Sequence, residues 1–265
     1  MIYSDKMQTV LFTSTIFGPI HSRRLGTSLG VNLMPRDGKV CTFDCLYCEA
    51  GFNAQGTGKA GLPSREEVFR LLDEKLSAMK SAGENLDVIT FSGNGEPTLH
   101  PHFCEIIDDV ISLRDKYFPK VKISVLSNST RIDRKDVAEA LCRIDNNILK
   151  LDSAITATVR KIDRPVAENF DVRKTIEYLS QFGEKCIIQT MFLKGEYEGV
   201  TFDNTTDEEI EALIEAYKQI KPSEVMIYSI DRKTPATGLV KIEKSELDVI
   251  ADKISKAGIK VMAAS

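Results

Sequence analysis

Short apolar runs alternate with amphipathic segments of helical period from residue 62 to the end of this 265-residue chain. The runs are rich in β-branched residues and short enough to be buried strands, while the segments between them repeat apolar residues every three or four positions. Strands that alternate with helices form a parallel sheet with right-handed crossovers. We expect strands at residues 87–93, 122–128, 147–153, 185–195, 224–230 and 259–264, and helices at residues 63–83, 102–118, 134–144, 170–183, 206–220 and 243–258.

Two further β-like runs, at residues 11–17 and 27–33, precede this repeat, with a loop rich in Gly, Pro and Arg between them. Together the runs predict about six βα units. No Gly-, Ser- or Pro-rich linker divides the chain, so we expect one domain over residues 1–265, in which residues 1–38 lead into the first functional loop. Six units form either an open doubly wound sheet or an incomplete barrel, and both gather ligands at the carboxyl ends of the strands.

Composition narrows the class of protein. The 35 basic and 39 acidic residues give a net charge of −4, which argues against a broad basic surface for nucleic acid. No apolar run approaches the roughly 20 residues of a membrane span, and an early Asp5 argues against a secretory signal. We therefore expect a cytoplasmic protein without membrane contact. In such a protein six cysteines indicate metal ligands or buried side chains, not disulfides.

Three cysteines lie close together after the second β-like run, in the pattern Cys-x3-Cys-x2-Cys at Cys41, Cys45 and Cys48. Soft thiolates select zinc, copper(I) or iron–sulfur clusters. A structural zinc site needs a fourth ligand, and three thiolates on a four-iron cluster leave one iron open for a substrate or cofactor. The remaining cysteines stand singly within predicted elements and are expected to pack in the core: Cys104, Cys142 and Cys186.

The stretch "CTFDCLYC" resembles the signature of the radical S-adenosylmethionine (SAM) enzymes, including an aromatic residue, Tyr47, before the third cysteine. The resemblance implies one 4Fe-4S cluster held by the three cysteines, with SAM bound to the open iron. It implies an oxidoreductase-type enzyme that cleaves SAM reductively to a 5′-deoxyadenosyl radical, which abstracts hydrogen from a substrate. It also implies an incomplete (βα)6 TIM-like barrel and an electron donor of the flavodoxin or ferredoxin type.

A glycine-rich stretch, "FSGNGEPTLHP" at residues 91–101, comes at the end of the second strand of the repeat, if the run before the cysteines is counted as the first. It resembles the "GGEP" loop that holds the SAM amino group in this superfamily. Gly93 keeps the first glycine, Asn94 takes the place of the second, and Gly95 and Glu96 complete the motif.

Polar side chains at later strand ends are further candidates for SAM binding. Asn128 and Asp152 are expected to contact the ribose or the carboxylate of SAM, or else to cap helices. Gln189 and Thr190 lie within the strand expected at residues 185–195 and are expected to reach the adenine.

Cationic side chains near the same loops are candidates for the substrate side of the site: His21, Arg23, Arg24, Arg164 and Arg232. The arginines are able to bind a phosphate or carboxylate of the substrate. Alternatively, they pair with acidic residues such as Asp44 or Glu49 and hold the cysteine segment in place.

Longer stretches resemble the branch of radical SAM proteins that contains the wyosine-base synthase of tRNA modification: "FGPIHSRRLGTSLGVNLMP", "DRP" at residues 163–165 and "YSIDRKTPATGL". The chain lacks the additional N-terminal cysteines and the C-terminal extension of that group. With a pI of about 5.6, a small-molecule or peptide substrate is expected before tRNA. The alternatives are a glycyl-radical activase acting on a partner protein, a wyosine-type tRNA-modifying enzyme, and a metal-binding regulator without turnover.

Overall fold

The structure is a computed structural model that describes residues 2–4, 7–22 and 26–264. Its main sheet has ten strands, and eight of them follow the path β12-β10-β8-β7-β6-β5-β4-β3. The parallel strands on this path are β4 (Gly26–Val31), β5 (Val88–Phe91), β6 (Lys122–Ser127), β7 (Asn146–Lys150), β8 (Ile187–Tyr197), β10 (Glu224–Ser229) and β12 (Val261–Ala264).

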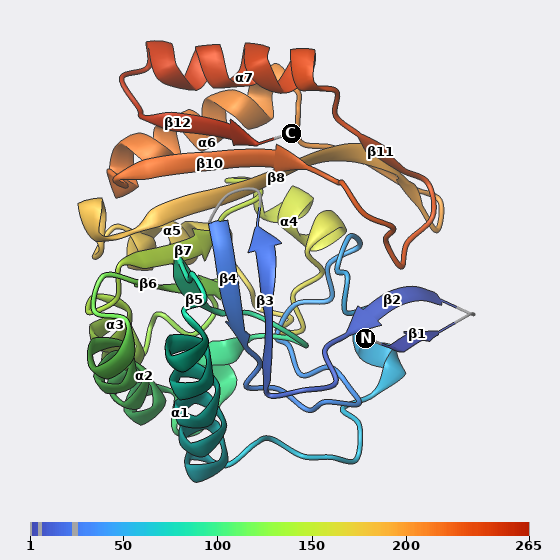
Figure 1. The fold of residues 1–265 in the computed structure, drawn as a ribbon. Coiled ribbons are helices and arrows are strands. Elements are labelled where there is room, and N and C mark those ends of the chain that lie inside the picture. Colours follow the sequence, from blue (N-terminus) through green and yellow to red (C-terminus); the bar gives the residue numbers. More distant parts are fainter. Residues whose placement is uncertain (1, 5–6, 23–25, 265) are drawn as a thin grey trace.

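Helices connect these strands and cover one face of the curved sheet (Figure 1). They are α1 (Arg65–Ala82), α2 (Phe103–Tyr117), α3 (Lys135–Leu141), α4 (Thr156–Ile162), α5 (Val172–Leu179), α6 (Asp207–Ile220) and α7 (Lys244–Lys256). Six βα units result, followed by the last strand β12. Neighbouring strands on the path are in chain order, and within the described residues its two ends, β3 (Ile16–Ser22) and β12, are not paired with each other. The predicted incomplete (βα)6 barrel is therefore confirmed.

Local signals explain the element ends. The hydroxyl of Ser64 caps α1 by accepting a hydrogen bond from the Glu67 amide at 3.1 Å, and Gly83 ends the helix with φ of 67°. Such an N-cap contributes about 1 kcal/mol to stability. Glycine adopts the left-handed conformation at a helix end without steric cost. The helix expected at residues 63–83 is thus confirmed with slightly shorter bounds.

The N-terminal part differs from the expectation. Residues 12–15 are not in a strand, and β3 extends through Gly18 and Pro19 into the segment expected as a loop. β3 pairs antiparallel with β4, and its register shifts between Phe17 and Ile20. A bulge on an edge strand accommodates proline because no ladder hydrogen bond is needed there.

The sequence did not predict the N-terminal hairpin of β1 (Ile2–Ser4) and β2 (Met7–Leu11). It also did not predict the helix α4 or the strands β9 (Val200–Asp203) and β11 (Leu239–Lys241). α4 is rich in β-branched residues, which have low helix propensity. The strands β9 and β11 pair antiparallel with the far end of β8. The last residues of β8 thus project beyond the barrel strands and form a small antiparallel sheet with β9 and β11.

The two faces of the barrel strands carry different side chains, because successive residues alternate across a strand. Leu29, Ile89 and Ile123 belong to the apolar core under the helices. Their neighbours on the other face are polar and bond across strands: the Ser28 and Thr90 hydroxyls at 2.8 Å, and the Asn146 amide donating to the Ser124 hydroxyl at 2.8 Å. The barrel interior therefore carries polar side chains that bond across strands. Among the described residues, no helix is long and apolar enough to span a membrane.

Candidate active site

The three clustered cysteines lie in a loop after β4, called here the cysteine loop (residues 39–51). Backbone hydrogen bonds hold it from two sides. Val40 pairs with the loop after β5, donating to the Asn94 carbonyl at 3.1 Å and accepting from the Glu96 amide at 3.0 Å. On the other side, the Leu46 amide donates to the Ile162 carbonyl at the end of α4 at 2.9 Å. The thiols therefore stand at the carboxyl ends of the first barrel strands.

The donor set fits an iron–sulfur cluster. Cys41 and Cys48 are half-buried and Cys45 is buried, and burial raises the pKa of Cys41 to about 12. Thiols in such surroundings become thiolates when a metal replaces the proton. Among the described residues, no three His, Cys, Asp or Glu side chains are placed to share one metal ion. A cubane has a different requirement, since each thiolate binds its own iron. Cys41, Cys45 and Cys48 remain the predicted ligands.

The glycine-rich stretch forms a loop between β5 and α2, called here the glycine loop (residues 92–97). Gly93 and Gly95 have φ of 152° and 141°. A Cβ atom at Gly95 would overlap the carbonyl oxygen of Val40, and one at Gly93 would overlap the Asn32 side chain. The glycine loop and the cysteine loop therefore pack backbone against backbone, which no other residue at position 95 permits.

Asn94 occupies the second glycine position of the motif, and its side chain points away from the cysteine loop. The Oδ1 atom accepts from the Phe12 amide at 2.9 Å, and Nδ2 donates to the carbonyls of Phe12 at 2.9 Å and Pro35 at 2.8 Å. The side chain is fully buried. It joins the chain before β3 to the glycine loop, so the observed contacts of the Asn94 side chain are structural. Any contact between Asn94 and SAM would therefore involve its backbone atoms, and this contact stays a prediction.

Glu96 is fully buried beneath the glycine loop. Its Oε1 atom accepts from the Ser127 hydroxyl at 2.9 Å and from Thr98, and its Oε2 atom accepts from the Asn128 amide at 2.6 Å. Burial raises its pKa, although these hydrogen bonds act in the opposite direction. Glu96 thus fixes the end of β6 to the glycine loop. Its predicted contact with SAM stays a prediction.

Asn128 follows β6 and reaches the cysteine loop. Its Nδ2 atom lies 3.5 Å from the Cys41 sulfur and 2.9 Å from the Thr42 hydroxyl, while Oδ1 accepts from the Thr130 amide at 3.1 Å. Hydrogen bonds to ligand sulfurs are one of the factors that set the potential of an iron–sulfur cluster. The structure therefore places Asn128 against a predicted ligand, and the expected contact with SAM is not tested.

Tyr47 and Asp152 belong to one group of four bonded side chains, three of them buried and Lys150 partly buried, called here the buried tetrad (Tyr47, Lys150, Asp152 and Asp163). The Tyr47 hydroxyl donates to Asp152 and, at 3.2 Å, to Asp163. Lys150 donates to Tyr47 and lies 2.9 Å from Asp152 and 3.6 Å from Asp163. Burial raises the pKa of Asp163, with the Asp152 carboxylate adding to the effect. Tyr47 and Asp152 are thus bonded to each other, and their predicted SAM contacts stay predictions.

Adjacent residues of β8 face opposite sides of the sheet. The Thr190 hydroxyl donates to the Leu151 carbonyl at 2.7 Å and lies 2.7 Å from the Tyr217 hydroxyl of α6. The expectation that Thr190 reaches the adenine is wrong, because strand alternation directs it to the helices. Gln189 is buried on the interior face, and its role remains a prediction.

Of the cationic candidates, two arginines are paired with acidic residues and the histidine is exposed. Arg164 lies 3.3 Å from Asp44, and Arg232 lies 2.7 Å from Glu49, so both pair with acids of the cysteine loop as the second alternative supposed. His21 is exposed at the end of β3. Arg23 and Arg24 lie outside the described residues.

The three cysteines outside the cysteine loop are free and pack in or against the core, as expected: Cys104, Cys142 and Cys186.

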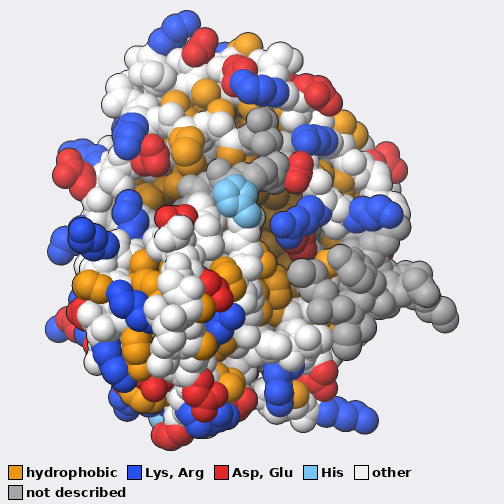
Figure 2. Space-filling view, viewed as in Figure 1, with side chains coloured by type: hydrophobic (Ala, Val, Ile, Leu, Met, Phe, Trp, Pro, Cys, Tyr) orange, Lys and Arg blue, Asp and Glu red, His pale blue; other side chains and the backbone are white. Residues whose placement is uncertain are grey.

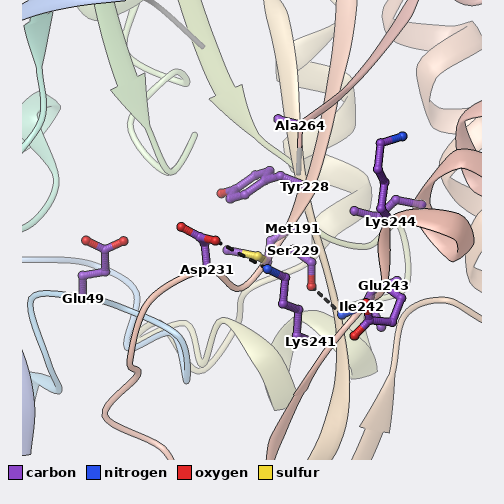
Figure 3. Close-up of a pocket in the computed structure, with 11 residues that line it drawn as sticks. Glu49, Met191, Tyr228, Ser229, Asp231, Lys241, Ile242, Glu243, Lys244 and Ala264 are labelled. Atoms are coloured by element: carbon purple, nitrogen blue, oxygen red, sulfur yellow. Dashed lines mark hydrogen bonds and ion pairs between the residues drawn. The ribbon is translucent and has the colours of Figure 1, made fainter. Parts of the chain in front are cut away.

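A cavity of about 170 Å³ opens at the carboxyl ends of β8 and β10. Figure 3 shows Asp231 and Lys241 pointing toward each other there, 3.4 Å apart, with Glu49 of the cysteine loop on one side and Lys244 of α7 on the other. Sequence reasoning did not single out Lys241 or Tyr228, which also lines it. The quoted stretch "YSIDRKTPATGL" begins with Tyr228 and carries three consecutive charged residues just after a strand, but it ends two residues before Lys241.

Two lysines with charged partners inside the fold, the buried Lys39 and the partly buried Lys150, were also missed. Each stands in an apolar context directly beside a motif, in "GKVC" and "LKLDS". A lone lysine of this kind is usually read as surface, because lysine is rarely buried unless it is paired. Only the partners brought together by the fold distinguish it.

A model of the Radical SAM superfamily matches residues 37–216, which run from the cysteine loop through the glycine loop and as far as α6. With the barrel and the three thiols beside the glycine loop, this match defines the class: the chain belongs to the radical SAM superfamily.

Curated relatives place the chain more closely. It is 30% identical over 256 residues to a UPF0026 protein of Methanocaldococcus jannaschii, a match that covers 93% of this chain and 74% of that protein. It is 29% identical over 237 residues to a GTPase Obg of Brachyspira hyodysenteriae, which covers 88% of this chain and 32% of that protein. The chain thus spans about a third of the latter relative.

Solved structures share the fold. A radical SAM methyltransferase from Sphaerobacter thermophilus superposes with a TM-score of 0.64 at 14% identity, covering 89% of this chain and 65% of that one. A structure of TYW1 with a lysine-pyruvate adduct bound superposes with a TM-score of 0.56 at 14% identity, covering 88% and 75%. The fold expected from the resemblance is therefore confirmed.

Proposed function

We propose that residues 1–265 form one radical SAM domain in which Cys41, Cys45 and Cys48 hold a 4Fe-4S cluster beside a SAM site on the glycine loop. When bound, the cluster supplies the electron that cleaves SAM to methionine and a 5′-deoxyadenosyl radical, which abstracts hydrogen from the substrate. One observation carries the proposal: Val40 pairs through its backbone with Asn94 and Glu96. The residue before the first thiol is thereby joined to the loop expected to hold the SAM amino group.

The residues of the chain would position SAM by holding the two loops in place. The backbone carbonyls of the glycine loop would accept hydrogen bonds from the SAM ammonium group, and the glycines let the backbone approach it. Glu96 and Asn94 hold that loop from below. The buried tetrad fixes the cysteine loop to β7 through Tyr47.

The substrate is a small molecule or a peptide that enters the cavity at β8 and β10. Support comes from its position beside Glu49, the residue after Cys48, and from its lining of both signs of charge. Acidic and basic side chains together suit a substrate that carries both an amine and a carboxylate.

An electron donor of the flavodoxin or ferredoxin type would complete the reaction. A second cavity, of about 330 Å³, lies on the outer side of the cysteine loop and is lined by Leu46, Arg160, Lys161 and Arg164 among others. Arg160 and Lys161 bond to backbone carbonyls, which leaves their charge available to an acidic partner. Free cysteines and the oxygen sensitivity of such clusters suit a cytoplasmic location.

The test is anaerobic reconstitution with iron and sulfide, followed by reduction with dithionite and chromatography of 5′-deoxyadenosine. We expect about four irons per chain and slow cleavage of SAM without substrate. The variant with Cys41, Cys45 and Cys48 replaced by Ala should bind no cluster, whereas the control Cys104→Ala should bind it fully. Four irons in the triple variant would refute the assignment.

A further inference from the structure

Lys39 is enclosed by the loop that carries the three cysteines. It stands two residues before Cys41, and its side chain is 1% exposed. Its Nζ atom donates to the carbonyl of Gly51, three residues after Cys48, at 2.7 Å. The ammonium group therefore closes the cysteine loop from inside, where water does not reach it.

The protein compensates this charge only in part. The nearest carboxylate is that of Asp44, 3.6 Å away. Asp44 is shared, because its Oδ1 atom also accepts from the Asn53 amide at 2.6 Å and its Oδ2 atom lies 3.3 Å from Arg164. A buried charge without a full partner is strongly unfavourable.

Lys150, a partly buried lysine, shows how two carboxylates compensate one ammonium group in this fold. Lys150 lies 2.9 Å from Asp152 and 3.6 Å from Asp163, so two carboxylates face one ammonium group. Lys39 has one carboxylate, which it shares with Arg164. The additional negative charge that Lys39 requires has to come from elsewhere in the cysteine loop.

The three cysteines lie on the loop that Lys39 closes through Gly51, and their thiolates on a bound cluster are the remaining source of negative charge in this loop. Three thiolates on a 4Fe-4S cluster give a net negative charge that increases on reduction. A cation inside the loop is attracted most strongly by the reduced state.

We propose that Lys39 is the internal counter-ion of the iron–sulfur cluster, and that its charge raises the reduction potential of the cluster. The inference rests on the proposed ligation by Cys41, Cys45 and Cys48. Lys39 is a positioning residue: it holds Gly51 by its hydrogen bond and acts on the cluster through its charge, without binding iron.

The test compares reconstituted wild-type protein with Lys39→Gln, which keeps a donor for the Gly51 carbonyl but removes the charge. The midpoint potential is measured by redox titration with detection of the reduced cluster by electron paramagnetic resonance. We expect Lys39→Gln to shift the potential to more negative values, with unchanged iron and sulfide content. Lys59→Gln, at an exposed lysine beyond the same loop, should leave the potential unchanged.

The outcomes separate the two proposals. A wild-type protein without a cluster would refute the proposed function itself. A loaded Lys39→Gln variant with the wild-type potential would refute the role of Lys39 alone. If Lys39→Gln folds but binds no iron, Lys39→Arg decides: recovery of iron supports a requirement for the charge, and loss of iron in both variants overturns it.

Discussion

At the scale of single residues, the glycine loop and the cysteine loop meet through backbone atoms. Gly93 and Gly95 permit this approach, and the Asn94 side chain holds the loop from the opposite side. The motif itself was visible in the sequence. The partner of Asn94 was not, because Phe12 is 82 positions away and only the folded chain brings them together.

Gly95→Ala should displace Val40 and with it Cys41, since the added methyl group would overlap the Val40 carbonyl oxygen. We expect cleavage of SAM to fall about 100-fold, as for other displacements of about 1 Å near a reacting centre. The measurement is 5′-deoxyadenosine formation by the reconstituted protein. Gly61→Ala is the control, because Gly61 also has positive φ but open space around it. Equal activities in the two variants would contradict the close approach.

Asn94→Ala should destabilise the protein by about 2–4 kcal/mol, since the Phe12 amide and the carbonyls of Phe12 and Pro35 lose their partners in a buried site. Urea unfolding followed by circular dichroism gives the change in free energy of unfolding. Asn85→Ala removes an exposed asparagine and should have little effect. A loss below about 0.5 kcal/mol, typical of surface positions, would show that the segment before β3 is not held by Asn94.

At the scale of elements, periodic patterns predicted the strands and long helices, because burial of one face imposes a period of two or 3.6 residues. They did not predict β9 and β11, since short antiparallel strands depend on the extension of β8. They did not predict the buried tetrad either. Its members come from the cysteine loop, β7, the residues after β7 and the end of α4, so no local spacing relates them.

Lys150→Met should destabilise the protein by roughly 3–5 kcal/mol near neutral pH, because it leaves two carboxyl groups buried without their cation. Burial already raises the pKa of Asp163, and Lys150 is the main group that lowers it. In the variant this pKa rises further.

A carboxyl group whose pKa is higher in the folded than in the unfolded state costs stability when ionised. The cost is present above the folded pKa and disappears as pH falls toward the ordinary carboxyl value. The deficit of Lys150→Met should therefore be smaller at about pH 5 than at about pH 8, measured by urea unfolding at both values. Lys122→Met, at an exposed lysine, should show no such trend. A deficit independent of pH would mean that the tetrad is not ionic.

At the scale of the whole molecule, charges of both signs are interspersed. The net charge of −4 arises from 35 basic and 39 acidic residues, and the face in Figure 2 shows Lys and Arg beside Asp and Glu without a large area of one sign. The basic group at Arg160, Lys161 and Arg164 is confined to one cavity. This group has room for a single anionic group or the edge of an acidic protein.

We therefore expect the protein to bind tRNA weakly and without selectivity. Tight binding to RNA neutralises many phosphates, releases their counterions and so falls steeply with salt, and recognition of folded RNA needs a surface that follows its shape. Bulk tRNA and an unstructured RNA of similar length should be compared by fluorescence anisotropy at low and physiological salt. We expect similar, weak binding of both at low salt that disappears at physiological salt. A submicromolar affinity for tRNA alone that persists at physiological salt would contradict the expectation, and would make a tRNA base the substrate to test in the cavity beside Glu49.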